Sequence, residues 1–303
     1  MGRTIDLQGH RGARGLFPEN TLAGFQGALS IGVNTLELDV RLTADGIVVV
    51  THDARLNPDI TRTADGRWLK EPGPLVSSLR LADLQAYDVG RIRPGSDYAT
   101  QYPDQAPQDG ASIPTFAEVV ALDPTVTFNV ELKSSPGCAD GERLADAVLA
   151  VADQLGATHR IIIQSFDWRG PRRVKRMRAD VRFAWLTRSE IMDEARRWWD
   201  GPHPSDFGGS VPRAVAAEGG AMWTPLHSDL TKDDLEEAHG LGLVVVPWTV
   251  NQPDDMRRLL VWGIDGLITD RPDLARTVLA EQGFSLPVPR SSRPEAQGSS
   301  LSR

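Results

Sequence analysis

The chain is poor in cysteine and contains no long apolar run. Its 303 residues include one cysteine, Cys138, which excludes an intramolecular disulfide and leaves no set of thiolates for a zinc site. A transmembrane helix needs about 20 consecutive apolar residues, and no stretch of the sequence approaches that length. We therefore expect no transmembrane segment and a fold that depends on an ordinary hydrophobic core.

Positive charge is also in deficit, because the formal net charge is -8 at pH 7. A net negative surface repels nucleic acid and anionic lipid at long range, which argues against both as partners. An anionic small-molecule substrate would need a locally positive site, such as a bound cation. The amino terminus, MGRTIDLQGHRG, lacks the apolar core of a secretory signal. The absence of this apolar core favours a cytoplasmic protein or the processed form of an exported one. The sequence does not indicate an oligomeric state.

Short apolar runs alternate with helix-like stretches along most of the chain. The strand candidates are Ile5–Gly9, Thr35–Val40, Ile47–Thr51, Val126–Leu132, Ile161–Ser165, Val181–Leu186, Met222–Leu226, Leu243–Thr249 and Ile264–Ile268. The helix candidates are Thr21–Ser30, Phe116–Leu122, Glu142–Leu155, Leu235–Leu241, Pro253–Trp262 and Leu274–Glu281. This alternation predicts an α/β fold with a parallel sheet, and the length suits a TIM (β/α)8 barrel, which typically needs about 250 residues.

The nine strand candidates are one more than the eight strands of such a barrel. An Ala44-Asp45-Gly46 turn closely follows the second candidate. We therefore interpret Arg41–Thr51 as a hairpin whose returning arm is a barrel strand. That hairpin would bring His52 back to the rim at which Asp39 ends.

Three regions interrupt the alternation. Residues 53–113 are rich in Pro, Gly, Asp and Arg and too long for an ordinary loop, which predicts an inserted subdomain after the third strand. The composition of Trp198–Val211 predicts a second irregular segment without regular secondary structure. The composition of Ser285–Arg303 predicts a polar, disordered tail. The predicted organisation is one barrel domain over residues 1–284 followed by this tail.

Two pairs of charged residues share a spacing of two on predicted strands. Glu37 and Asp39 would therefore point to one face, as would Glu131 and Lys133. Carboxylates crowded in a barrel interior repel each other and lose hydration, unless a cation binds or one acid stays protonated. A hard divalent cation would resolve this. The alternatives are a solvent-facing strand for the first pair and a structural ion pair for the second.

His10 and His52 each follow a predicted strand. The loops after barrel strands build the active site, so two imidazoles at this rim predict acid–base chemistry, although a single one is more often packed or solvated. Asn20 suits a helix N-cap, whereas its neighbour Glu19 has no such local role. Trp248 ends a very hydrophobic strand and is either a wall of the pocket or a plain core side chain.

Nine motifs occur between residues 10 and 272, and together they resemble one known family. They are His10-Arg11-Gly12, Pro18-Glu19-Asn20-Thr21, Glu37-Leu38-Asp39-Val40, Thr43-Ala44-Asp45-Gly46, His52-Asp53, Glu131-Leu132-Lys133, Gln164-Ser165-Phe166-Asp167, Trp248-Thr249-Val250-Asn251 and Gly266-Leu267-Ile268-Thr269-Asp270-Arg271-Pro272. In this order they resemble the glycerophosphodiester phosphodiesterases, TIM-barrel enzymes related to phosphatidylinositol-specific phospholipase C.

The resemblance implies a metal-dependent active site. One divalent cation, Mg²⁺, Ca²⁺ or Mn²⁺, would be held by Glu37, Asp39 and Glu131. His10 and His52 would be the catalytic acid–base pair.

The resemblance also implies how the substrate is bound and what it becomes. Arg11 and Lys133 would contact the phosphate, and Glu19 and Trp248 would support the site. The expected reaction is hydrolysis of a small glycerophosphodiester to an alcohol and glycerol 3-phosphate. The residues leave open which alcohol departs, and whether a histidine activates water or the substrate's own 2-hydroxyl.

Other functions are compatible with parts of this pattern. A phospholipase D-like or lysophospholipid-cleaving phosphodiesterase could use Trp198 and Trp199 as an interfacial patch, against the acidic net charge. A barrel that has lost catalysis would be a binding protein, but all the charged motif residues are retained. Two carboxylates alone would also suit a glycosidase, whereas the paired histidines and Lys133 favour phosphate chemistry.

Overall fold

The computed structural model describes residues 3–134, 140–191, 198 and 201–290. Cys138 and Trp199 lie outside the described residues. Eight parallel strands form the barrel in the described part of the chain. They are β1 (Asp6–Gly9), β2 (Thr35–Leu42), β4 (Thr127–Leu132), β5 (Ile161–Ser165), β6 (Arg182–Thr187), β7 (Met222–Pro225), β8 (Val244–Val245) and β9 (Gly266–Thr269).

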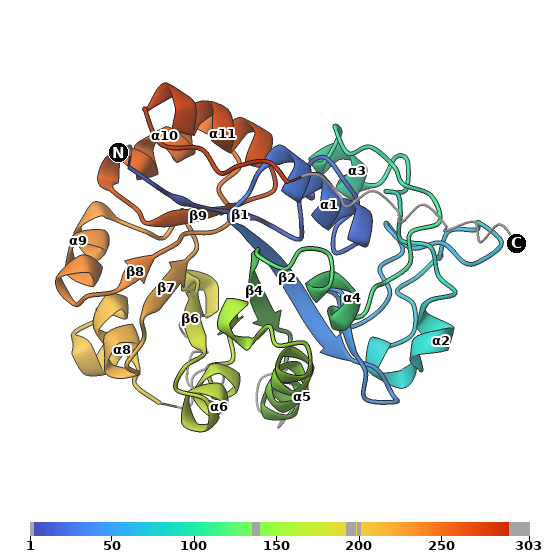
Figure 1. Ribbon diagram of the computed structural model, residues 1–303, viewed down its shortest axis with the longest axis horizontal. Helices are drawn as coiled ribbons and strands as arrows, with labels where there is room; N and C mark the ends of the chain where they lie inside the picture. Colours follow the sequence, from blue (N-terminus) through green and yellow to red (C-terminus); the bar gives the residue numbers. More distant parts are fainter. Residues whose placement is uncertain (1–2, 135–139, 192–197, 199–200, 291–303) are drawn as a thin grey trace, which may run out of the picture.

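The strand order β8-β7-β6-β5-β4-β2-β1-β9 brings the two ends of the chain together in the sheet. Backbone hydrogen bonds then link the β8 region to β9, including Ile268 N–H to Pro247 O at 3.0 Å and Val250 N–H to Ile268 O at 2.9 Å. The barrel is therefore nearly closed, as Figure 1 shows. β8 is short because Pro247, which has no N–H, follows it closely.

The hairpin prediction is wrong in one respect. β3 (Val48–Val50) pairs antiparallel with β2 but is not a barrel strand, because β2 pairs directly with β4. β2 is eight residues long, and β3 pairs with its last three, Val40 to Leu42. His52 still reaches the rim, because Thr51 donates its N–H to Asp39 O at 2.9 Å.

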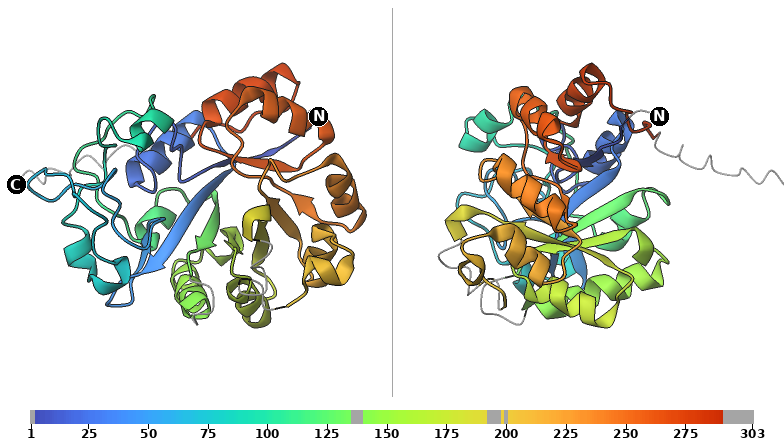
Figure 2. Two further views of the ribbon diagram at one scale, coloured as in Figure 1. Left: turned by 180° about the vertical axis from the view of Figure 1, so that it is seen from behind. Right: turned by 90° about the vertical axis from the view of Figure 1, so that its left-hand side faces the viewer.

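Helices cover the outer face of the barrel, as the two further views in Figure 2 show. The longer ones are α1 (Leu22–Ile31), α5 (Asp140–Gln154), α6 (Arg169–Met177), α8 (Val211–Ala217), α9 (Lys232–Gly240), α10 (Pro253–Trp262) and α11 (Pro272–Glu281). The short ones are η1 (Val76–Ser78), α2 (Leu81–Leu84), α3 (Asp97–Gln101), α4 (Phe116–Val120), η2 (Thr158–Arg160), η3 (Ser189–Ile191) and η4 (Pro204–Phe207). Each predicted helix overlaps an observed one, whereas α6 and α8 were not predicted.

Alternation along β2 divides its side chains between two environments. Leu36, Leu38 and Val40 belong to the main hydrophobic cluster between the strands and the helices. By the alternation of the strand, Glu37 and Asp39 point the other way, into the barrel, where both are almost fully buried. The fold therefore places two carboxylates inside the barrel, since burying the leucines leaves them no other side.

Residues 53–113 connect β3 to α4 along an irregular path on one flank of the barrel (Figure 1). They share a small hydrophobic cluster of their own, which includes Leu56, Leu84 and Ile113. That this region is a separate inserted subdomain stays a prediction. No helix in the described parts of the chain has both the length and the apolar composition needed to cross a bilayer.

The prediction of a disordered tail from Ser285 onward is wrong for its first residues. Ser285 donates its N–H to Arg3 O at 3.0 Å, and Arg290 donates its N–H to Leu29 O at 2.8 Å. Backbone groups of this segment thus pair with the barrel rather than with water alone. Residues 291–303 lie outside the described part of the chain.

Candidate active site

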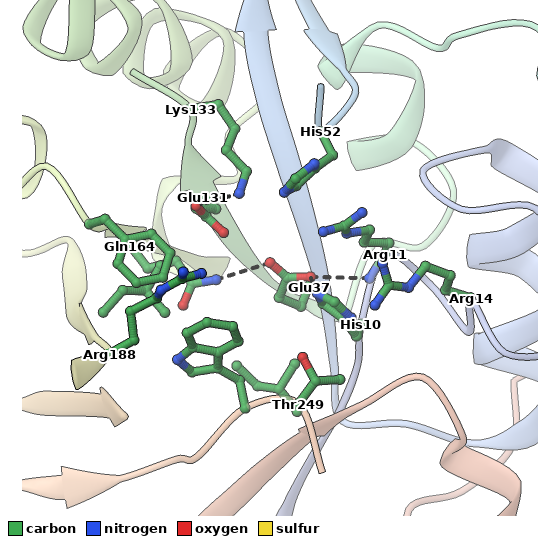
Figure 3. Close-up of a pocket in the computed structure, with 14 residues that line it drawn as sticks. His10, Arg11, Arg14, Glu37, His52, Glu131, Lys133, Gln164, Arg188 and Thr249 are labelled. Atoms are coloured by element: carbon green, nitrogen blue, oxygen red, sulfur yellow. Dashed lines mark hydrogen bonds and ion pairs between the residues drawn. The ribbon is translucent and has the colours of Figure 1, made fainter. Parts of the chain in front are cut away.

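A cavity of about 230 Å³ lies at the carboxyl ends of the barrel strands. Seven of the nine predicted site residues line it: His10, Arg11, Glu37, His52, Glu131, Lys133 and Trp248. Figure 3 labels all of these except Trp248 and shows the labelled side chains converging on one space. Asp39 and Glu19 lie behind this wall, each in contact with Arg11.

Three carboxylates form the centre of the site. One oxygen from each of Glu37, Asp39 and Glu131 lies within 4.8 Å of the others, and all three residues are buried. Parallel pairing of β2 with β4 places Asp39 directly opposite Glu131, which explains why acids from distant parts of the sequence meet. This spacing is short enough for one cation to contact all three.

Glu37 is held on both oxygens by uncharged donors. Arg11 donates its backbone N–H to Oε2 at 3.1 Å, and Gln164 donates Nε2–H to Oε1 at 3.0 Å. Burial, and then the charges of Asp39 and Glu131, raise the pKa of Glu37 well above its ordinary value. Without an added positive charge nearby, this acid tends to keep a proton.

Asp39 has the opposite electrostatic balance. Burial raises the pKa of Asp39, but Lys133 and Arg11 outweigh this and bring it well below its ordinary value. Lys133 Nζ lies 3.2 Å from Asp39 Oδ1 and 2.6 Å from Glu131 Oε1. Asp39 Oδ1 is nevertheless buried and accepts no hydrogen bond from the residues that the structure describes.

The second oxygen of Asp39 is held by Asn20, whose amide donates at 2.9 Å. Asn20 has a left-handed backbone, with φ of 53°, which orients this contact. The prediction of Asn20 as an N-cap is wrong, because Thr21 caps α1 and accepts from Gly24 N–H. The helix does begin with a polar N-cap residue, but that residue is Thr21, one position after Asn20.

The charges of the site fit a divalent cation. The site contains five buried carboxylates and three permanently charged side chains, which leaves two negative charges when all are ionised; four of the carboxylates contact these cations, and Glu37 does not. The acids are Glu19, Glu37, Asp39, Glu131 and Asp270, and the cations are Arg11, Arg14 and Lys133. Oxygen ligands suit hard cations, and Asp39 Oδ1 has a free acceptor position. The acidic cluster can therefore hold a metal ion.

His10 is fixed from the far end of the chain. Its Nδ1 lies 2.6 Å from Asp270 Oδ1, and its Nε2 lies 3.8 Å from Glu37 Oε2. Asp270 also accepts from Arg14 Nε at 2.9 Å and from Asn251 Nδ2 at 2.7 Å. Burial lowers the pKa of His10 to about 4, although Asp270 opposes this. At neutral pH the ring is uncharged.

His52 has a looser and more open environment. Its Nδ1 lies 2.7 Å from Asp53 Oδ1, and Asn57 donates to the other oxygen of Asp53 at 2.9 Å. The side chain of His52 is 33% exposed. Both histidines therefore have an aspartate on Nδ1, which leaves Nε2 for the cavity.

Arg11 and Glu19 form a buried ion pair behind the acids, with 2.9 Å between NH1 and Oε1. Tyr98, on α3, donates its phenol to Glu19. Tyr102 packs its ring against Arg14, 4.6 Å from the guanidinium carbon to the ring centroid. The irregular region between β3 and α4 thus supports the site from outside the barrel.

Sequence reasoning gave no role to several residues of the site. Arg14, Gln164, Arg188 and Asp270 contact or line the cavity. Gln164 and Asp270 lie within two of the nine motifs, but the sequence alone assigned no role to either residue. Trp248 is a cavity wall and not only a core side chain, with its indole N–H donated to Thr224 O at 3.0 Å.

Comparisons with known proteins cover most of the chain. The sequence model of the glycerophosphoryl diester phosphodiesterase family matches residues 10–274. A glycerophosphodiester phosphodiesterase of Caldanaerobacter subterraneus subsp. tengcongensis is 28% identical over 276 residues, covering 90% of this chain and 97% of that protein. The Silicibacter pomeroyi DSS-3 crystal structure that carries the same family name is 36% identical, with a TM-score of 0.86, covering 93% of this chain and 95% of that chain.

A third comparison concerns a protein with a bound product. A phosphodiesterase of Oleispira antarctica was crystallised with sn-glycerol-3-phosphate, and it is 22% identical with a TM-score of 0.69, covering 91% of this chain and 97% of that chain. At this identity the likeness shows the shared fold. The fold and the site define a TIM-barrel phosphoric diester hydrolase. The chain belongs to the glycerophosphoryl diester phosphodiesterase family.

Proposed function

We propose that this enzyme hydrolyses glycerophosphodiesters to glycerol 3-phosphate and an alcohol, with one divalent cation and two histidines. The observation that carries the proposal is the meeting of three carboxylates and two aspartate-bound histidines around one cavity. The product bound to the Oleispira antarctica phosphodiesterase supports glycerol 3-phosphate as the product here.

Glu37, Asp39 and Glu131 would hold the cation, which is Mg²⁺, Ca²⁺ or Mn²⁺ by the chemistry of an all-oxygen ligand set. When bound, the cation supplies positive charge to the phosphate oxygens as their negative charge grows. Arg11 and Lys133 line the same cavity and would bind the remaining phosphate oxygens. Their carboxylate partners in this structure hold both side chains in position.

His10 is the better candidate for the base. Its Nδ1 donates a hydrogen bond to Asp270, so Nε2 carries the lone pair, and the lowered pKa keeps the ring neutral. Nε2 would accept the proton of the attacking hydroxyl, from water or from the substrate's own glycerol. His52 would then donate a proton to the departing alcohol, and its partial exposure allows it to regain that proton from solvent.

Of the two tryptophans that could form an interfacial patch, the one within the described residues does not support action at a lipid surface. Trp198 is partly buried and packs against the main hydrophobic core. An interfacial residue would instead leave its ring exposed on a surface patch. Soluble diesters are therefore the preferred substrates of this proposal.

The proposal is tested with purified, metal-stripped protein. Adding Mg²⁺, Ca²⁺ or Mn²⁺ should restore release of glycerol 3-phosphate from soluble glycerophosphodiesters, followed by ³¹P NMR, which would also reveal a cyclic phosphate intermediate. Glu37→Gln should lose cation binding and activity. Glu281→Gln, a matched change of a half-exposed carboxylate on α11, should retain both. Full activity in Glu37→Gln, or activity that EDTA leaves intact, would contradict the proposal.

A further inference from the structure

One wall of the cavity contains none of the proposed catalytic or metal-binding residues. It consists of Phe166, Leu186, Arg188 and Trp248, which we call the alcohol wall. Phe166 and Trp248 pack edge to face with ring centroids 5.4 Å apart. Arg188 is the charged member, and Figure 3 shows it reaching into the cavity near Gln164, on the side away from Arg11 and Arg14.

The backbone on both sides of Arg188 is fixed. Leu226 donates its N–H to Thr187 O at 2.9 Å. Ser189 donates its N–H and its hydroxyl to Asp229, at 2.6 and 3.0 Å. The guanidinium is therefore presented from an anchored position, which reduces the entropy lost when it binds a ligand.

The charge of Arg188 is not used by the acids of the site. The other three cations of the cavity wall each pair with a buried carboxylate: Arg11 with Glu19, Arg14 with Asp270, and Lys133 with Glu131. Arg188 instead pairs with Glu190, whose side chain is 68% exposed and which does not line the cavity. Arg188 Nε is also buried without a hydrogen-bond acceptor among the described residues.

We propose that Arg188 binds a negatively charged group on the alcohol part of the substrate. The enzyme then favours glycerophosphodiesters whose alcohol carries a carboxylate or a second phosphate. This inference rests on the proposed hydrolysis of glycerophosphodiesters. A guanidinium matches a carboxylate or phosphate with two parallel hydrogen bonds. The cavity, at about 230 Å³, is small enough for a short alcohol on the bound phosphate to reach the alcohol wall.

The same wall disfavours a purely cationic alcohol. Aromatic faces such as those of Phe166 and Trp248 can attract an ammonium group. Here, however, Arg188 lines the same wall, so that an ammonium would meet a like charge. The net effect is selection against choline-like and ethanolamine-like groups that lack an accompanying anion.

Two diesters that differ by a single carboxylate test this directly. The value of kcat/KM is measured for glycerophosphoserine and glycerophosphoethanolamine from release of glycerol 3-phosphate. The wild type should favour the serine diester by about tenfold, the size of one charge-assisted hydrogen bond at a partly exposed site. Arg188→Gln should remove this preference by slowing the serine diester, while hydrolysis of the ethanolamine diester should not slow and should rise where the like charge of Arg188 had opposed the ammonium. Arg188→Lys, which keeps the charge, should retain part of it.

Arg213→Gln is the matched control. Arg213 is exposed, pairs with Glu237 on α9 and lies outside the cavity wall, so its loss changes the net charge equally and should leave the preference intact. Undiminished activity of Arg188→Gln on the ethanolamine diester shows that this variant is folded. An equal loss on both diesters would place Arg188 on the scissile phosphate and overturn the proposal, as would an unchanged preference. If the wild type releases glycerol 3-phosphate from neither diester, the proposed function fails and this inference fails with it.

Discussion

His10 and His52 face one cavity from two regions that differ in burial and in support. His10 follows β1 in the barrel, and its side chain is 10% exposed. Its partner Asp270 follows β9 and is itself held by Arg14 and Asn251. His52 follows β3, outside the barrel, and its partner Asp53 is 40% exposed.

The difference shows how one site can combine a rigid and an adaptable group. The barrel strands β1 and β9 pair along their whole length, so His10 and Asp270 are positioned by backbone that moves little. A base aimed in advance needs no reorganisation during the reaction. A proton donor that exchanges with solvent, such as His52, benefits from the more open region.

The largest expected effect comes from removing either ring. His10→Ala and His52→Ala should each lower kcat by at least about 100-fold, within the range of general acid–base catalysis. Added imidazole should partly rescue His52→Ala, because that position opens to solvent, and should rescue His10→Ala much less. Steady-state assays with and without imidazole measure this. Equal rescue of the two variants would contradict the contrast in burial.

Replacing the aspartate partners of the two histidines should have smaller effects than removing the rings. The loss should again be larger on the His10 side, at Asp270, than on the His52 side, at Asp53. Asp270→Asn removes a buried partner of both Arg14 and His10, and should cost about 3–5 kcal/mol of stability and lower kcat by on the order of 100-fold. Asp53→Asn affects a half-exposed pair and should cost no more than about 1 kcal/mol. Denaturant unfolding and kcat are measured for both variants. Comparable losses would mean that the partner of His52 is as firmly required as that of His10.

Part of the site, though not the contrast between the two histidines, could be anticipated from the sequence. Alternation along β2 predicts that Glu37 and Asp39 share a face, because Leu36 and Leu38 must pack against helices. The motif order predicts which strand ends carry histidines. The first inference depends only on the alternation of neighbouring residues, and the second on the resemblance of the nine motifs to a known family.

What could not be predicted depends on pairing between distant segments. The contact between His10 and Asp270 joins residues 260 positions apart and follows from barrel closure, which no local pattern encodes. The position of β3 outside the barrel is similar, because the arm of a hairpin and a barrel strand have the same alternation. Arg14 is paired with Asp270 through the same closure.

The pH at which His10 binds a proton should be lower than that of an ordinary histidine. Burial lowers the pKa of His10 to about 4 from 6.5, so in the metal-free protein the ring stays neutral until the pH approaches 4. The unfolded chain takes up that proton near pH 6.5, hence acidification between these values favours unfolding. NMR of the imidazole nitrogens measures the first effect. Comparing denaturant unfolding of the wild type and His10→Gln across this range measures the second, and the slope with pH should be shallower in the variant.

The smallest effect tests whether residues 53–113 support the His10 side of the site. Tyr98 donates to Glu19 and accepts from Arg14 NH1 at 3.4 Å, so Tyr98→Phe removes one link to the ion pairs behind His10. We expect kcat to fall by no more than about fivefold, consistent with one net hydrogen bond of about 1 kcal/mol. Tyr87→Phe, in the small hydrophobic cluster of the same region, is the matched control and should be neutral. A loss with Tyr98→Phe as large as that with Asp270→Asn would show that this region, and not the barrel alone, fixes His10.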